Sequence, residues 1–383
     1  MRRPSVAQAA ALEAGQRWED AARAWAAVRD RSDGDQARNA AGRCQSCWRR
    51  GDRPRLVLEA GDAALALGLD PIQASTVRLS MASACAQLGE LERAEGLSKD
   101  AVRGASSAEQ RELAMDTLLG IWLQRGELVA FAGALAADPR DGPSPPREFR
   151  RVQRDRLIGR LDEAVMRLEQ LERNLGLTPP VRGACAAELG EIALVRGEHE
   201  QAMALFAESA RAWEQASRMA PRWSAEAARG LAASWIAPDG VGLDVGVAWA
   251  RRRGLVGLEA WLRLARGLCA TRSDPTSGAR DLSRAQELAD GAGARLISGR
   301  IRWLRCTVGL GDLRELERAV VELTGDAGWW APAALALAEA LAQDDRARGV
   351  KLAMGAHTCF VGMHLIAEQE RALDTIKALS GAI

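Results

Sequence analysis

Hydrophobic and polar positions along the chain form short helical patterns that are separated by glycines. In the stretch LGELERAEGLSKDAV, residues 88–102, Gly89 ends one predicted helix, and Ala94, Ser98 and Ala101 then fall on one face of the next. Small residues on that face let two helices approach closely, and glycine closes a helix end at no steric cost. The pattern therefore predicts a helical hairpin that turns at Gly89.

The same turn recurs along the chain. Glycines in equivalent settings stand at positions 15, 51, 89, 126, 159 and 197, so the consecutive intervals are 36, 38, 37, 33 and 38 residues. Two further turns are predicted at Gly240 and Gly311. A single hairpin cannot bury its apolar face, so neighbouring hairpins must stack to form a continuous core. The sequence predicts an all-α solenoid of antiparallel helix-turn-helix repeats, without a sheet.

The stretch ELGEIALVRGEHEQAMALF resembles the tetratricopeptide repeat (TPR), a helix-turn-helix of 34 residues. Leu189 and Gly190 match the Leu-Gly of its first helix, Gly197 matches the turn, and Ala202 with Phe206 matches the Ala-x3-Phe of its second helix. The resemblance is to degenerate bacterial TPR-like proteins. It covers roughly residues 6–355, in nine or ten units.

This resemblance implies a right-handed superhelix whose first helices line a concave groove. The proline-rich stretch DPRDGPSPPREF is expected to lie outside helices, because proline is excluded from helix interiors. It would separate N-terminal TPR-like repeats (1–137), through a connection at 138–149, from C-terminal repeats (150–355). Residues 272–278 are expected to form a loop, and residues 356–383 a final capping helix.

The charge balance and the cysteine content indicate which partners and which compartment to expect. The chain has 52 Lys and Arg residues against 51 Asp and Glu residues, and this neutral balance argues against a broad phosphate-binding face and a nucleic-acid partner. No apolar run is long enough for a membrane span, and the N-terminal stretch lacks the clean apolar run of a signal peptide. Seven cysteines indicate free thiols. We expect a cytoplasmic protein without a membrane partner.

Signatures of catalysis are missing from the sequence, which shows no nucleophile elbow, phosphate loop or HExxH motif. Cys44 and Cys47 form a CxxC motif, but no second ligand pair accompanies them, so we interpret both as core residues. His357 and His364 are expected to share one helix face while Cys359 points elsewhere, which leaves a zinc site without enough ligands. We expect no enzyme activity, no metal and no cofactor.

Tryptophans gather between residues 213 and 261. Trp249 falls at a second-helix core position, whereas three others fall on predicted first helices, and arginines lie near them. Tryptophan and arginine are the residues most enriched at binding hot spots. The alternative is that tryptophan fills the core in a chain without tyrosine. The predicted partner-binding residues are Trp223, Trp235, Trp261, Arg218, Arg222, Arg229 and Arg263.

The function predicted from these features is a non-catalytic scaffold that binds a protein or peptide in the groove of a TPR-like superhelix. Two alternatives stay open at this point. The first is a ligand- or partner-gated sensory array of a bacterial regulatory system, as the resemblance to the arrays of large regulators suggests. The second is an enzyme with a site in the groove. The sequence leaves the partner and the oligomeric state open.

Overall fold

A computed structural model describes residues 4–137, 144–176, 178–236 and 242–381. These residues form helices joined by turns, and none of them lies in a strand. The prediction of an all-helical chain is confirmed for this part of the sequence. No helix within it has both the length and the apolar character that a membrane crossing requires.

The chain divides into two compact units, which are described separately. Unit 1 comprises Met1–Trp122 with Ala248–Leu258, and unit 2 comprises Leu123–Val247 with Glu259–Ile383. The boundaries follow residues 122, 247 and 258, so none of them coincides with the predicted connection at 138–149.

Helices α1 to α7 are Val6–Ala14, Trp18–Arg29, Gly34–Arg50, Pro54–Leu65, Pro71–Gln87, Leu91–Gly104 and Ala108–Arg125. Helices α8 to α14 are Leu128–Ala136, Pro145–Leu157, Leu161–Leu175, Pro179–Val195, His199–Gln215, Met219–Ile236 and Leu243–Arg253. Helices α15 to α21 are Val256–Ala270, Pro275–Gly291, Arg295–Thr307, Leu313–Glu322, Ala327–Ala340, Arg346–Gly362 and Ile366–Ser380.

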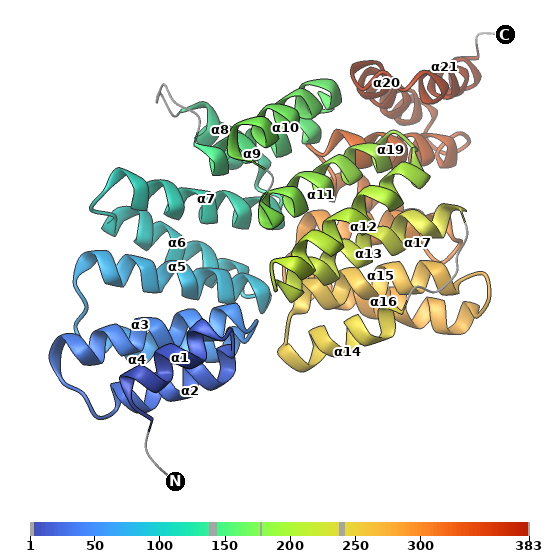
Figure 1. Cartoon of the computed structure of the whole chain (residues 1–383). Coiled ribbons are helices and arrows are strands. Elements are labelled where there is room, and N and C mark those ends of the chain that lie inside the picture. The colour runs from blue at the N-terminus through green and yellow to red at the C-terminus, as the bar shows by residue number, and fades with distance from the viewer. Residues whose placement is uncertain (1–3, 138–143, 177, 237–241, 382–383) are drawn as a thin grey trace. The chain divides into compact units, whose positions relative to one another are not determined.

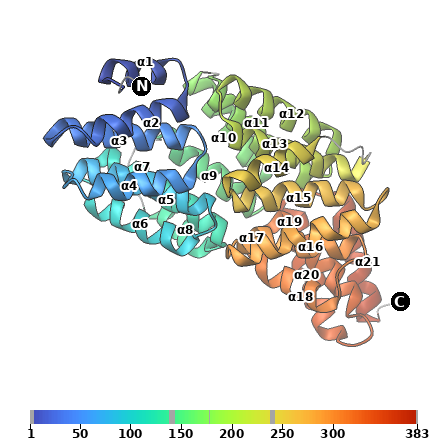
Figure 2. The same ribbon diagram turned by 90° about the horizontal axis from the view of Figure 1, so that it is seen from below.

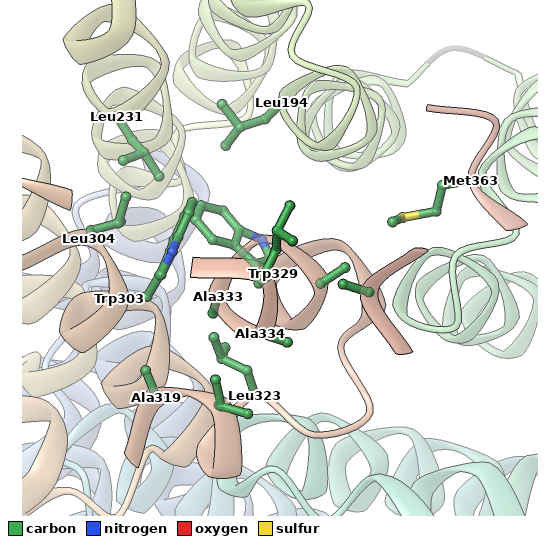
Figure 3. Packing of buried hydrophobic residues seen from close by; sticks show 14 of the residues in the cluster. Leu194, Leu231, Trp303, Leu304, Ala319, Leu323, Trp329, Ala333, Ala334 and Met363 are labelled. Atoms are coloured by element: carbon green, nitrogen blue, oxygen red, sulfur yellow. The ribbon is translucent and has the colours of Figure 1, made fainter. Parts of the chain in front are cut away.

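Within each unit, consecutive helices lie side by side as hairpins (Figures 1 and 2). Examples are α2 to α6 in unit 1 and α11 to α13 in unit 2. Each unit has its own apolar core. The core of unit 1 is built largely from alanines, with Trp25 and Trp48, and that of unit 2 centres on leucines together with Trp303 and Trp329. Figure 3 shows how these two indoles pack among leucines and alanines of unit 2.

The hairpin of α11 and α12 shows why the TPR-like residues occupy their positions. Phe206 of α12 is fully buried, and its ring lies against Gly190 of α11 so closely that a Cβ at Gly190 would be 2.7 Å from Cε1. Gly197 adopts φ +75 at the turn, and Ala202 is fully buried where the helices meet. The TPR-like form of this hairpin is therefore confirmed.

At some of the predicted turns, a residue other than the predicted glycine takes the left-handed conformation. Gly15 and Gly51 have φ values of −78 and −82, and the next residue, Gln16 or Asp52, takes the left-handed conformation instead. Near the predicted turn at Gly311, the left-handed residue is Gly309. Gly240 lies outside the described residues.

Two predicted loops were wrong in part, for one reason. Residues 145–149 form the first turn of α9, and α16 begins at Pro275 inside the loop expected at 272–278. Proline lacks an N–H group, but the first turn of a helix has no intrahelical acceptor for that group, so proline is well suited to it. Residues 138–143 lie outside the described part of the chain.

The C-terminal segment is not one capping helix. Within residues 356–383, α20 ends at Gly362 and α21 begins at Ile366. His364 lies in the turn between them with φ 59, whereas His357 lies in α20. The expectation that these two histidines share one helix face is therefore wrong.

Candidate protein-binding site

The three predicted tryptophans lie in different environments. Trp223 of α13 is 8% exposed, and its ring lies against Gly246 of α14, where a Cβ would be 2.6 Å from Cε3. Trp261 of α15 is partly buried against the core of unit 2. Trp235, near the end of α13, is 41% exposed. Trp223 is therefore a core residue, and Trp235 is the most accessible of the three.

The predicted arginines are engaged mainly with carboxylates of the chain itself. Arg263 is almost buried, and it contacts Glu259 and Asp281 at 2.8 Å each. The ion pairs of the other two helical arginines are Arg222–Glu214 at 3.6 Å and Arg229–Glu226 at 2.8 Å. Arg218 is exposed just before α13. The structure therefore does not gather these arginines around Trp235.

Trp235 instead belongs to a row of aromatic rings in unit 2. Its indole stacks on the imidazole of His199, with centroids 5.5 Å apart and planes 4° apart. The Trp303 ring lies 6.4 Å from the indole of Trp235, tilted by 30°, and contacts Trp329 edge-on at 5.5 Å. We call these four residues the aromatic row; it is contributed by α12, α13, α17 and α19.

Exposure falls along the aromatic row. Trp235 is exposed, Trp303 is 9% exposed, and Trp329 is 3% exposed and packs among the leucines and alanines seen in Figure 3. The row thus presents one accessible indole next to two indoles that are buried in the core. An immobilised indole loses little side-chain entropy when a partner contacts it.

The inner end of the aromatic row adjoins a cluster of charged side chains. Arg300 of α17 lies 4.7 Å from the centroid of Trp329 and pairs with Asp326 at 2.8 Å and Glu191 at 3.3 Å. Arg156 of α9 pairs with Glu188 at 2.9 Å and lies 3.8 Å from Glu191. We call Arg156, Glu188, Glu191, Arg300 and Asp326 the buried ion cluster.

The buried ion cluster joins helices that are distant in sequence. It ties α9, α11 and α17 to the start of α19, all within unit 2. Burial disfavours the charged form of Arg156, but Glu188, Glu191 and Asp326 outweigh it and raise the pKa of Arg156 above its ordinary value. Arg156 therefore remains charged, and its ion pairs link α9 to α11.

Burial lowers the pKa of His199 below its ordinary value of 6.5. The Nδ1 atom of this ring is buried and has no hydrogen-bond partner within the described part of the chain. At neutral pH the imidazole beside Trp235 is therefore uncharged. This neutral form gives an apolar, flat surface against which the indole can stack.

The cysteines do not have the features of reactive thiols. Cys44 and Cys47 are buried in the core of unit 1, as predicted, and burial raises the pKa of both, that of Cys47 to about 12. A high thiol pKa disfavours the nucleophilic and metal-binding thiolate. Across the described residues, no three His, Cys, Asp or Glu side chains are grouped so as to hold a metal ion.

Sequence reasoning missed three members of the aromatic row. His199, Trp303 and Trp329 come from three different hairpins, so no local pattern joins them to Trp235. One signal was present for Trp303, because it falls on a first helix as Trp235 does.

Comparison with known proteins assigns the chain to no family. No family model matches the chain. No curated protein matches it either. Among solved structures, it is similar to a Rap protein complexed with competence and sporulation factor, at 10% identity and a TM-score of 0.49, over 80% of this chain and 98% of that one.

Two further solved structures are similar to the chain. Yeast Tom70 is 13% identical with a TM-score of 0.30, over 98% of this chain and 94% of that one. The APC/C hetero-tetramer Cut9-Hcn1 is 12% identical with a TM-score of 0.29, over 96% and 89%. The assignment of a TPR-like helical-repeat fold rests on the chain's own hairpins, above all on the packing of Phe206 against Gly190.

Proposed function

We propose that this protein is a non-catalytic scaffold that binds a protein or peptide partner, with the indole of Trp235 as an anchor. The observation that carries the proposal is the aromatic row, in which a tryptophan that is 41% exposed stacks on His199 and also lies beside Trp303. Aromatic side chains that are rigid before binding are typical anchors of protein interfaces.

The surroundings of Trp235 support a binding role rather than a chemical one. Arg229 and Arg263 pair with carboxylates of unit 2, and within the described residues the uncharged ring of His199 has no carboxylate partner. The proposed compartment is the cytosol, because all seven cysteines are free.

A peptide-display selection tests this function. The full-length protein is immobilised, peptides are selected from a random library, and each selected peptide is measured against wild type, Trp235→Ala and Trp249→Ala. Trp249 is a partly buried tryptophan beside Arg253 and is not in the aromatic row, so it serves as the matched control.

The proposal expects peptides whose binding is lost in Trp235→Ala and kept in Trp249→Ala. Selected peptides that bind all three proteins equally would show that partners dock elsewhere. A selection that yields no specific peptide, repeated with folded protein, would count against a peptide-binding scaffold altogether.

A further inference from the structure

A second feature of unit 2 lies away from the aromatic row. Residues of helices α17, α18 and α20 line an open pocket of about 640 Å³. Four arginines, two glutamates and one valine line it: Arg302, Arg314, Arg318, Arg348, Glu317, Glu322 and Val321. The lining therefore carries more positive than negative charge.

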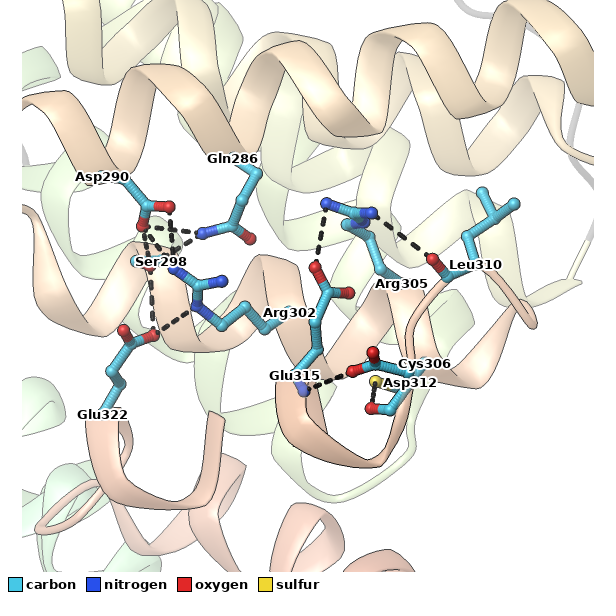
Figure 4. A network of polar contacts seen from close by, with 10 residues as sticks. All are labelled: Gln286, Asp290, Ser298, Arg302, Arg305, Cys306, Leu310, Asp312, Glu315 and Glu322. Carbon is cyan, nitrogen blue, oxygen red and sulfur yellow. Dashed lines mark hydrogen bonds and ion pairs between the residues drawn. The ribbon is translucent and has the colours of Figure 1, made fainter. Parts of the chain in front are cut away.

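The back of the pocket is rigid. Arg302 is nearly buried and contacts Asp290 at 2.7 Å and Glu322 at 3.1 Å. Ser298 and Gln286 both contact Asp290, at 2.5 and 2.9 Å, as Figure 4 shows. This network fixes one guanidinium at the pocket wall, and its charge is already balanced by the two carboxylates.

The rim of the pocket differs from its back. Arg348 of α20 pairs with Glu317 of α18 at 2.5 Å. Arg314 and Arg318 of α18 are both exposed, and neither has a carboxylate partner within the described part of the chain. They stand four residues apart on one helix and therefore point to the same side. The pocket lining thus includes two exposed guanidinium groups that have no carboxylate partner among the described residues.

The apolar part of the lining limits the kind of ligand. Val321 of α18 is 59% exposed and stands three residues after Arg318, on the same side of the helix. It offers a contact for an aliphatic side chain or stem. A ligand that suits the pocket therefore combines negative charge with apolar carbon.

We propose that this pocket binds an acidic protein segment, with carboxylates of the partner held by Arg314 and Arg318 and an aliphatic group against Val321. Guanidinium groups bind carboxylates through paired hydrogen bonds. Nucleic acid fits less well, because a phosphate backbone has no aliphatic side chain to place against Val321 and because the chain as a whole is nearly neutral. The inference rests on the proposed function, since it takes the ligand to be a protein.

The test compares two double variants of the full chain that lose the same charge. The first is Arg314→Ala with Arg318→Ala. The control is Arg211→Ala with Arg280→Ala, which removes exposed arginines from α12 and α16, outside the pocket. The probes are a fluorescein-labelled oligoglutamate peptide and a single-stranded DNA oligonucleotide of equal net charge, measured by fluorescence anisotropy at low ionic strength. Circular dichroism checks that each variant is folded.

We expect wild type to bind oligoglutamate, the pocket variant to lose about tenfold in affinity, and the control to change less than about twofold. A charge-reversed variant, Arg314→Glu with Arg318→Glu, should lose oligoglutamate binding further and gain binding of oligolysine. Glutamate is a good helix former, so α18 should tolerate it.

Several results would overturn the inference. These are no oligoglutamate binding by wild type, an equal loss in the pocket variant and the control, or tighter binding of the oligonucleotide than of oligoglutamate with the same dependence on Arg314 and Arg318. Trp235→Ala should leave oligoglutamate binding unchanged. If the pocket fails while selected peptides still require Trp235, this inference falls and the proposed function stands.

Discussion

The indole of Trp235 and the imidazole of His199 stack face to face, with ring planes only 4° apart. Trp235 lies in the last turn of α13 and His199 is the first residue of α12, so the stack joins the end of one helix to the start of its neighbour. Trp303 supports the indole from α17. An exposed tryptophan with two aromatic neighbours distinguishes this position from the buried Trp223 and the partly buried Trp261.

Truncation of the predicted tryptophans should separate core from surface. Trp223→Ala should lower the free energy of unfolding by about 3 to 5 kcal/mol, because it empties a buried site beside Gly246. Trp235→Ala should cost about 1 to 2 kcal/mol, since the ring is 41% exposed and loses mainly its aromatic contacts. Urea unfolding followed by circular dichroism measures both values. Equal losses would contradict the distinction.

The titration of His199 should leave a signature in stability. Its pKa is lowered in the folded state, so the unfolded chain binds more protons as the pH falls. The stabilising contribution is fully present above the unfolded value, near 6.5, and is lost as the pH falls from there towards the folded value. His199→Gln should flatten this part of the stability curve.

Two measurements check the role of His199. Unfolding free energies of wild type and His199→Gln are compared from pH 7.5 to pH 5, about the range over which an ordinary histidine titrates. The imidazole resonance that disappears in the variant should titrate below 6.5 in wild type. A midpoint at or above that value would show that burial does not control this ring.

Much of the fold follows from the sequence alone. The intervals between glycines predict the hairpins, and Ala94, Ala164 and Ala202, each five residues after a turn glycine, are fully buried as small contact residues should be. Turns were less predictable. Gln16 and Asp52 adopt the left-handed conformation, although the glycine before each of them was predicted to do so. The prolines that indicated loops stand at the starts of α9 and α16.

The site was harder to predict than the fold. The local sequence does not distinguish Trp223 from Trp235, because both lie on α13 with small neighbours. Their different exposure depends on what packs against them: Trp223 lies against Gly246 of α14, whereas Trp235 has His199 and Trp303 as ring neighbours and stays 41% exposed. Contacts between distant hairpins decide this, and no periodic pattern within one hairpin encodes them.

Replacement of Cys44 and Cys47 together by alanine should leave binding intact and cost on the order of 1 to 3 kcal/mol of stability. Both thiols are buried in unit 1, and burial raises the pKa of Cys47 to about 12. Iodoacetamide should therefore label them slowly in the folded protein and rapidly in denaturant. Stoichiometric zinc that disappears in the double variant would contradict a purely structural role.

The buried ion cluster should be far more sensitive to mutation than a surface pair. Asp326→Ala removes a carboxylate that is 1% exposed and leaves Arg300 with Glu191 as its remaining ion partner, so we expect a loss of about 3 to 5 kcal/mol. Glu339→Ala breaks the exposed pair with Arg371 and should cost less than about 1 kcal/mol. Thermal unfolding compares the two. Similar losses would mean that the cluster does not hold unit 2 together.

The central claim is that Trp235 anchors a protein or peptide partner. Isothermal titration of a display-selected peptide against wild type, Trp235→Ala and Trp235→Phe measures it most directly. The account predicts that Trp235→Ala loses about 2 kcal/mol of binding free energy, close to thirtyfold in affinity, while Trp235→Phe, which keeps an aromatic ring beside His199, loses less. Unchanged affinity of a folded Trp235→Ala protein for every selected peptide would contradict the account.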